Sequence, residues 1–247
     1  ILFLSIFLSM QIKRLLLKLS GEALQGGQDG GIDVDFLHNL SAKVARIAHS
    51  GNQLVIVIGW GNIFRGVSWA AKWIDRASAD YMGMMATIIN GVALSDAIEK
   101  AGCHTRIMSW IEIDKVAEPF IRRRALRHLE KGRVIICVGG TGNPFFTTDS
   151  AAVLRGLELD CNVVVKGTKV DGVYDRDPVK HSDAKRYNRV SYDTAIEKNL
   201  RIFDQSAFAL ARDENIPIFV CRIEDIDRFS QSDVNLDFGT LISSEGE

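Results

Sequence analysis

The stretch "RVIICVGGTGNPFFTTDS", residues 133–150, decides the fold of this chain. Its first seven residues are an apolar run, which is typical of a strand that is buried on both faces. Gly139, Gly140 and Gly142 then let the chain turn sharply, and Thr147 to Ser150 can begin a helix whose free N–H groups attract anions. The stretch therefore predicts a strand, a glycine-rich loop and a helix, in that order.

The same alternation recurs along the chain. Strands are predicted at residues 12–20, 53–59, 104–109, 133–139, 162–167 and 216–221, with a last short strand at 239–243. Helices are predicted at 33–50 and 76–101, directly after the 139–150 stretch, and at 191–198 and 204–214. Apolar strands separated by helices indicate an α/β fold with a largely parallel sheet that is covered on both faces.

Two of these helices have an apolar periodicity that predicts their buried face. Helix 33–50 begins at an Asp33 cap, ends at Gly51 and buries Leu37, Leu40, Val44 and Ile47. Helix 76–101 ends at Gly102, and we expect it to turn Met85, Ile88, Ile89 and Val92 inward.

Composition narrows the class of protein. The chain has 247 residues, 47% of them hydrophobic and 25% charged, which is ordinary for a globular domain. A net charge of -1 argues against a nucleic-acid-binding surface spread over the whole protein. The four cysteines are far apart and form no CxxC pair, so we expect reduced, buried thiols in a cytoplasmic protein, and no zinc.

The first residues, "ILFLSIFLSM", are apolar but only ten residues long, whereas a membrane-spanning helix needs about 20. They carry no basic segment typical of a secretory signal. We therefore expect a single domain over residues 10–247 that begins at Met10, with 1–9 as an extension, and no membrane association.

In parallel sheets, ligands bind beyond the carboxyl ends of the strands, so the segments that follow the strands are candidate site residues. "KLSG" (18–21) offers a lysine for a phosphate and a glycine that allows close approach, although a solvated lysine beside a turn has the same pattern. "GWGNIFRG" (59–66) adds glycines and Arg65, which suits bidentate phosphate binding or an exposed position equally well.

The other two strand ends suggest a nucleotide. Phe145 and Phe146 can wall a pocket for a planar base, and Asn143 has the paired donor and acceptor that a pyrimidine edge requires. In "GTKVDGVYDRDP" (167–178), Tyr174 can lie against a purine and an aspartate can bind a ribose hydroxyl, although an acidic surface hairpin is an alternative. For Asp80 and Asp204, a structural role at the start of a helix is a sufficient explanation.

Several known site motifs are absent from the sequence. It has no GxxxxGK[ST] phosphate loop, no GxGxxG after the first strand, no GxSxG elbow and no histidine spacing typical of a metal site.

The chain resembles the bacterial uridylate (UMP) kinases of the amino acid kinase superfamily. The resemblance covers residues 11–243, and its most specific blocks are "KLSGEAL" (18–24), "GNIFRG" (61–66), "DYMGMMATIINGVAL" (80–94), "GTGNPFFTTDSAA" (140–152) and "KVDGVYDRDP" (169–178). It implies a three-layer αβα sandwich and phosphoryl transfer from ATP, with Mg²⁺, to UMP. It also implies a homohexamer that GTP activates and UTP inhibits.

The resemblance implies roles for individual residues. ATP would be held at its phosphates by Lys18, Leu19, Ser20 and Gly21, with Gly61 and Arg65 close by, and at its nucleoside by Thr168, Tyr174 and Asp177. UMP would be bound by Trp60, Asp80, Thr141, Gly142, Asn143, Pro144, Phe145, Phe146, Thr147 and Thr148. The loop tied to GTP activation would comprise Gly26, Gly27, Gln28, Asp29, Gly30 and Gly31. No residue of the chain is assigned to a metal.

Phosphoryl transfer requires positioning and charge stabilisation more than covalent chemistry. Lys18 and Arg65 would stabilise the transition state, and either Asp204 or Asp149 would orient Lys18. No general base is required, because UMP already brings an ionised phosphate oxygen.

The chain departs from the family at Trp60, where the family has glycine. A tryptophan there must either turn outward or occupy space that UMP needs. The chain has three further tryptophans, Trp69, Trp73 and Trp110, and we expect small residues at most of these four positions. Two alternatives follow: a superfamily kinase for a carboxylate or carbamate, against which "NPFFTTD" argues, and a non-catalytic nucleotide-binding or regulatory homologue whose acceptor site Trp60 blocks.

Overall fold

The computed structural model describes residues 9–10, 12–64, 73–200, 202–231 and 234–246. Within these ranges the core of the fold is a nine-stranded sheet in the order β5-β4-β6-β3-β2-β7-β9-β11-β8. The strands β5, β4, β6, β3, β2, β7 and β9 run parallel to one another. β11 runs antiparallel to β9 and parallel to β8. In sheet order they span Glu118–Pro119, Thr105–Ser109, Val134–Val138, Gln53–Ile58, Arg14–Leu19, Val163–Thr168, Ile218–Arg222, Gly239–Ser243 and Arg189–Ser191. A separate pair joins β1 (Ser9–Met10) to β10 (Val234–Asn235).

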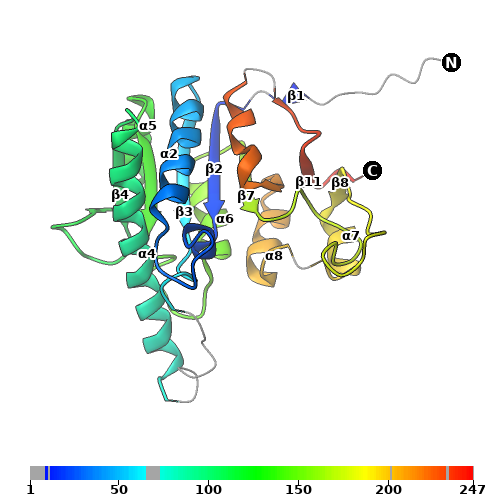
Figure 1. The fold of residues 1–247 in the computed structure, drawn as a ribbon, viewed down its shortest axis with the longest axis horizontal. Helices are drawn as coiled ribbons and strands as arrows, with labels where there is room; N and C mark the ends of the chain where they lie inside the picture. Colours follow the sequence, from blue (N-terminus) through cyan, green and yellow to red (C-terminus); the bar gives the residue numbers. More distant parts are fainter. Residues whose placement is uncertain (1–8, 11, 65–72, 201, 232–233, 247) are drawn as a thin grey trace.

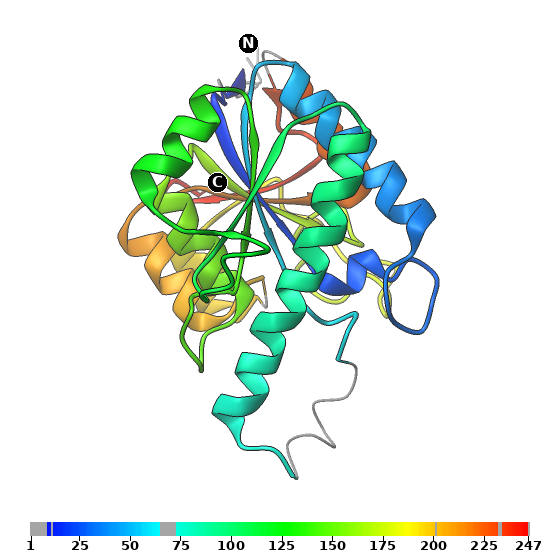
Figure 2. The same cartoon turned by 90° about the vertical axis from the view of Figure 1, so that its left-hand side faces the viewer.

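Helices cover both faces of the sheet (Figures 1 and 2). One face carries α1 (Gly21–Leu24), α2 (Val34–His49), α4 (Arg76–Lys100) and the 3-10 helix η1 (Ile223–Ser230). The other carries α5 (Arg122–Glu130), α6 (Thr148–Glu158) and α8 (Gln205–Asp213), and α7 (Tyr192–Glu197) lies near β8. The alternation of side chains along β2 feeds two cores, with Leu15 and Leu17 on one face and Leu16 on the other. The predicted three-layer α/β sandwich is confirmed.

Capping residues and glycines in the sequence predicted the ends of most helices correctly. The side chains of Asp33, Thr147, Ser191 and Asp204 each accept a backbone N–H at the start of a predicted helix. The predicted stripe on α2 is buried throughout, and the left-handed Gly51 (φ 94°) follows the end of that helix. All four cysteines are buried free thiols.

The predicted inner face of α4 is wrong. Ile88 is buried, but Met85, Ile89 and Val92 are 52%, 54% and 41% exposed. The face on the sheet is instead made largely of small and polar residues together with Met84, Leu94 and Ile98. A Cβ on Gly91 would lie 2.4 Å from Cγ1 of Val138 in β6, so this glycine lets the helix approach the sheet closely. The buried face of α4 is therefore the one whose small residues allow close packing on the sheet, and not the more hydrophobic one.

α4 is also the one helix of the described residues that is long and apolar enough to cross a membrane, judged by length and composition alone. Half of its most apolar window, 50%, is buried inside the protein. It packs against α2 and against β3, β4 and β6, so it is a core helix of this fold.

Seven short or weakly patterned elements were not predicted from the sequence: α1, α5, η1, β1, β5, β8 and β10. In α5 only Ala125 and Leu129 are buried among nine mostly charged residues, which leaves little apolar periodicity to detect.

Candidate functional site

The carboxyl ends of β2, β3, β6 and β7 meet at the lower edge of the sheet in Figure 1. Two glycine loops touch there. The Gly59 N–H donates to the Leu19 carbonyl over 2.9 Å, and a Cβ on Gly21 would lie only 2.5 Å from the Gly61 nitrogen. A side chain at position 21 would therefore displace the loop after β3.

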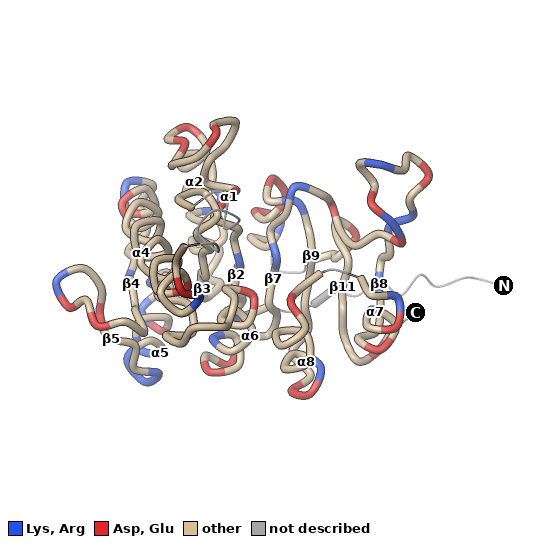
Figure 3. Tube along the Cα trace, turned by 90° about the horizontal axis from the view of Figure 1, so that it is seen from below, with Lys and Arg blue, Asp and Glu red and all other residues tan. Residues whose placement is uncertain are grey.

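Lys18 and Lys166 hold directly opposed positions on the parallel strands β2 and β7. Asp149, in the first turn of α6, bridges them, with one carboxylate oxygen 2.5 Å from the Lys18 Nζ and the other 3.1 Å from the Lys166 Nζ. Figure 3 looks at this edge from below and shows basic residues on both strands. Two ammonium groups share one carboxylate, so the cluster keeps a net positive charge suited to phosphate groups.

Lys166 was not singled out from the sequence. Its ammonium also donates to the Ile202 carbonyl and lies 4.6 Å from the centre of the Phe203 ring. Burial, and then the neighbouring charge of Lys18, lower the pKa of Lys166, while Asp149 opposes the shift. The available signal was a lysine directly after three valines, at the end of a strand buried on both faces.

Asp204 has a different role from Asp149. It accepts hydrogen bonds from the hydroxyls of Ser206 (2.6 Å), Ser150 (3.1 Å) and Thr147, and from the Ala207 N–H (2.8 Å). Burial alone would raise the pKa of this carboxyl, but these hydrogen bonds outweigh it and the pKa is lowered. Asp204 thus fixes the start of α6, and Asp149 is the acidic residue that contacts Lys18.

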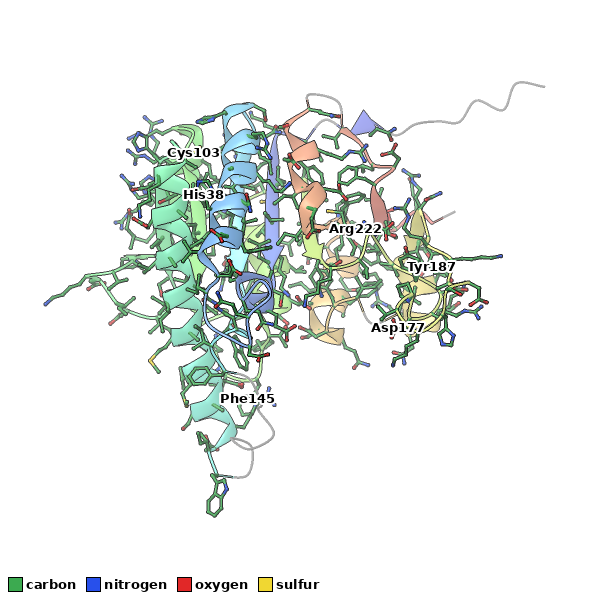
Figure 4. The ribbon with its side chains drawn as sticks, viewed as in Figure 1. His38, Cys103, Phe145, Asp177, Tyr187 and Arg222 are labelled. Carbon is green, nitrogen blue, oxygen red and sulfur yellow. The ribbon has the colours of Figure 1, made fainter. Side chains whose placement is uncertain are left out.

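Two large cavities meet at this cluster. A cavity of about 700 Å³ is lined by Lys18, Ser20, Lys166 and Thr168, and also by Gly26 and Gly27 of the loop predicted to respond to GTP. A second, of about 490 Å³, is lined by Lys166 and Thr168 again, with Tyr174 and Asp177. The residues predicted for the ATP nucleoside therefore line the second cavity, and Lys166 and Thr168 border both. Figure 4 shows Asp177 on the α7 side of this edge.

The remaining predicted ATP residues differ in what they expose. The Leu19 side chain is buried in the core, and a Cβ on Gly61 would lie 2.9 Å from Cγ of Glu22. Tyr174 is held by its hydroxyl, which donates to Asp171 over 2.7 Å. Arg65 falls outside the described residues.

A third, smaller cavity of about 100 Å³ lies beside the loop after β6. Its lining includes six of the residues predicted to bind UMP, namely Trp60, Asp80, Thr141, Phe146, Thr147 and Thr148. Gly142, Asn143 and Pro144 belong to the same loop but not to the lining. Phe145 is 69% exposed and lies beside the lower end of α4 in Figure 4.

Asp80 ties this loop to α4. Its carboxylate accepts the Phe145 N–H over 2.7 Å and pairs with Arg76 at 2.9 Å. Phe145 has a φ of 71°, a left-handed conformation that is uncommon for a bulky residue. The aspartate thus holds a strained turn of the loop in place.

Trp60 turns inward, toward α4. A Cβ on Gly83 would lie 2.9 Å from Cε2 of its indole, and the ring lines the third cavity. Trp60 is not among the described residues with a left-handed φ, so its backbone carries no such strain. The ring occupies volume in the predicted UMP pocket, and the remaining 100 Å³ is below the roughly 300–1,000 Å³ of typical ligand sites.

Comparison with known proteins agrees with this geometry. The model of the amino acid kinase family matches residues 13–222. The curated uridylate kinases of two Xanthomonas campestris pv. campestris strains are each 54% identical over 209 residues, which is 85% of this chain and 87% of theirs. The crystal structure of UMP kinase from Bacillus anthracis has a TM-score of 0.90 at 36% identity and covers 96% of this chain and 98% of that one. UMP kinase from Ureaplasma parvum has a TM-score of 0.84 at 34% identity, over 95% of this chain and 100% of its own.

Proposed function

The chain belongs to the amino acid kinase family and to its uridylate kinases, and we propose that it transfers the γ-phosphate of ATP to UMP, giving ADP and UDP. The observation that carries the proposal is the Lys18–Asp149–Lys166 cluster. It borders the cavity of the predicted ATP residues, and Asp149 belongs to the helix that follows the predicted UMP loop.

The reaction needs little more than placement and positive charge. An oxygen of the UMP phosphate forms a bond to the γ-phosphorus, and the bond from that phosphorus to the bridging oxygen of ADP breaks. Lys18 and Lys166 balance the negative charge that spreads over the transferred group. Asp149 keeps the two ammonium groups in register without neutralising both. We assign no general base, because the attacking oxygen is already ionised.

Mg²⁺ fits this site as a companion of ATP. Among the described residues, no three His, Cys, Asp or Glu side chains gather so that they could hold a metal ion. Both oxygens of Asp149 face ammonium groups. The phosphate oxygens of ATP would therefore supply most ligands of the ion, which is how Mg²⁺ usually binds in kinases. Its chemistry when bound is to neutralise phosphate charge.

The assembly and its regulation also belong to this proposal. The outer face of α4 exposes Tyr81, Met85, Ile89 and Val92, an apolar stripe that suits contact with a second copy in a homohexamer. The loop 26–31, two of whose glycines line the 700 Å³ cavity, is the region proposed to respond to GTP, with UTP as inhibitor. We place the enzyme in the cytoplasm, where its nucleotide substrates and the reduced state of its four free thiols are expected.

A coupled assay of ADP release tests the proposal with UMP, CMP and glutamate as acceptors. We expect release with UMP at the highest kcat/KM. Release with glutamate alone would identify a carboxylate kinase instead.

The Trp60 ring in the acceptor pocket favours a second candidate, a non-catalytic nucleotide-binding homologue. Such a protein would bind ATP yet release no ADP with any of the three acceptors, so the same assay combined with ATP titration separates the two candidates.

A further inference from the structure

Two buried asparagines outside the predicted site lie beneath its loops. Asn62 follows the glycine loop after β3 and is 2% exposed, and Asn90 lies on the inner face of α4 and is 0% exposed. Their side chains form a closed amide pair. The Asn62 Nδ2 donates to the Asn90 Oδ1 over 2.9 Å, and the Asn90 Nδ2 donates to the Asn62 Oδ1 over 2.7 Å.

The second hydrogen of each amide binds a loop carbonyl. Asn90 donates to the Gly59 carbonyl over 2.8 Å, and Asn62 donates to the Gly31 carbonyl over 2.9 Å. Gly31 in turn donates its N–H to the backbone carbonyl of Asn62 over 2.9 Å. All four N–H donors of the pair are therefore used, in a place where an unpaired donor would be costly.

Only asparagine satisfies this arrangement at either position. Aspartate lacks both donors, leucine lacks donors and acceptor, and glutamine is one methylene too long for a packed site. The space is also tight, because a Cβ on Gly21 would lie 2.7 Å from the Asn62 Oδ1. The pair thus lies directly against Gly21, which follows β2, although neither residue lines any of the three cavities described above.

α4 makes similar contacts with the other loop of the site. Thr87, one turn before Asn90, accepts the Gly139 N–H over 2.8 Å, and Asp80 accepts the Phe145 N–H. Polar residues on one helix therefore hold both the loop after β3 and the loop after β6. A shift of α4 would change the distance between the two nucleotide phosphates.

We propose that Asn62 and Asn90 are a positioning pair that fixes the glycine loop after β3 against α4 and joins the loop 26–31 to the same helix. The inference rests on the proposed kinase function. Neither side chain is required to touch a nucleotide. The pair acts through Gly59, Gly21 and Gly31, so its loss disturbs the alignment of the phosphates more than the binding of either nucleotide.

The test compares Asn62→Ala, Asn90→Ala and the double variant with Ser41→Ala. Ser41 is a matched control, because it is 1% exposed and donates only within α2, to the His38 carbonyl. We expect each single asparagine variant to lower kcat about tenfold while both KM values change little. The kcat of the double variant should be no lower than that of the less active single variant, because the two residues act as one unit.

Hydrogen exchange of the amides in residues 26–31 gives a readout that does not need activity. It should quicken in both asparagine variants and stay at the wild-type rate in Ser41→Ala. Asn90→Ser, which retains a hydroxyl near the Gly59 carbonyl, replaces the alanine variant if that variant does not fold.

Normal kcat and normal exchange in folded variants of an active wild type would overturn the inference. A wild type without UMP-dependent ADP release would overturn the proposed function instead, and the exchange measurement would still decide whether the pair holds the loop.

Discussion

Lys18 lies directly beside Lys166 across β2 and β7, and both ammonium groups contact the single carboxylate of Asp149. Two adjacent parallel strands thus place two ammonium groups side by side, and the first turn of α6 places the carboxylate that contacts both. Without a ligand, this arrangement leaves one positive charge uncompensated. We propose that an incoming phosphate supplies the missing negative charge.

Lys18→Ala should lower kcat by about a hundredfold or more, because the loss of one charge that stabilises the transition state costs a few kcal/mol. Folding should change little, because Asp149 keeps Lys166 as its partner. Steady-state kinetics and thermal unfolding measure the two effects. Lys100→Ala is the control, since Lys100 pairs with Asp96 in the last turn of α4, at the other end of that helix from Asp80. Near-normal turnover of the folded Lys18 variant would remove this residue from the mechanism.

Lys166 should give the enzyme an early loss of activity at alkaline pH. Burial and the charge of Lys18 lower its pKa from the ordinary 10.5, so the folded enzyme loses this charge at a lower pH than a free lysine does. Because the neutral form lacks the charge that phosphate needs, kcat should fall as pH rises through the lowered pKa. In Lys166→Arg the positive charge persists at alkaline pH, so the alkaline limb of the pH profile should shift to higher pH. An unchanged limb would show that another group causes it.

The ionisation of Lys166 should change the free energy of unfolding in the opposite direction from activity: stability should rise with pH where activity falls. The unfolded chain binds this proton more tightly than the folded protein does, so the residue costs stability below the lowered pKa. That cost diminishes as pH rises from the folded pKa toward 10.5. Unfolding by urea at several alkaline pH values separates this gain in stability from the loss of activity.

The sequence predicted the fold well because most of its signals are local. Caps such as Asp33 and Asp204 and left-handed glycines such as Gly51 fix element ends within a few residues. The inner face of α4 was predicted wrongly because the side that packs on β6 is chosen by fit, and a Gly91 without a side chain fits best. Lys166, Asn62 and Asn90 were missed because their partners are far away in the sequence. Only the sheet register and the packing of α4 bring them to the site.

Asp80→Asn should raise KM for UMP far more than KM for ATP. The aspartate holds the Phe145 N–H and Arg76 beside the small cavity, whereas Tyr174 and Asp177 line a different cavity. Asp75→Asn is the matched control, because Asp75 caps the same helix through the Ser78 N–H and, among the described residues, makes no hydrogen bond to the loop after β6. This substitution should cost only about a few tenths of a kcal/mol of stability. Equal changes of both KM values would argue against an acceptor-side role for Asp80.

Ile89→Lys should disrupt the proposed homohexamer. Ile89 is 54% exposed in the single chain and lies in the apolar stripe on the outer face of α4. A lysine there would be solvated in a monomer but desolvated between two copies, so the stable species should become smaller. Light scattering after size-exclusion chromatography measures the mass. Val179→Lys, at a residue that is 85% exposed outside the stripe, is the control. An unchanged mass for Ile89→Lys would exclude this face as the contact between copies.

Trp60→Gly should tighten UMP binding and raise kcat/KM for UMP, while ATP binding changes less. The indole packs against Gly83, and Trp60 lines the cavity of about 100 Å³ that we propose as the acceptor site, so removal of the ring enlarges that cavity. The backbone of Trp60 is not left-handed, so glycine relieves no strain there, and any gain comes from the space released. Glycine also makes the loop less ordered in the free enzyme, which works against binding and sets an upper limit on the gain. Trp73→Ala is the control loss of an indole, because Trp73 is 86% exposed and does not line the cavity. Calorimetric titration of both variants and of the wild type with UMP decides the matter. Should the wild type bind UMP as tightly as Trp60→Gly, the ring must leave the pocket at no cost, and the idea that it blocks the acceptor site fails.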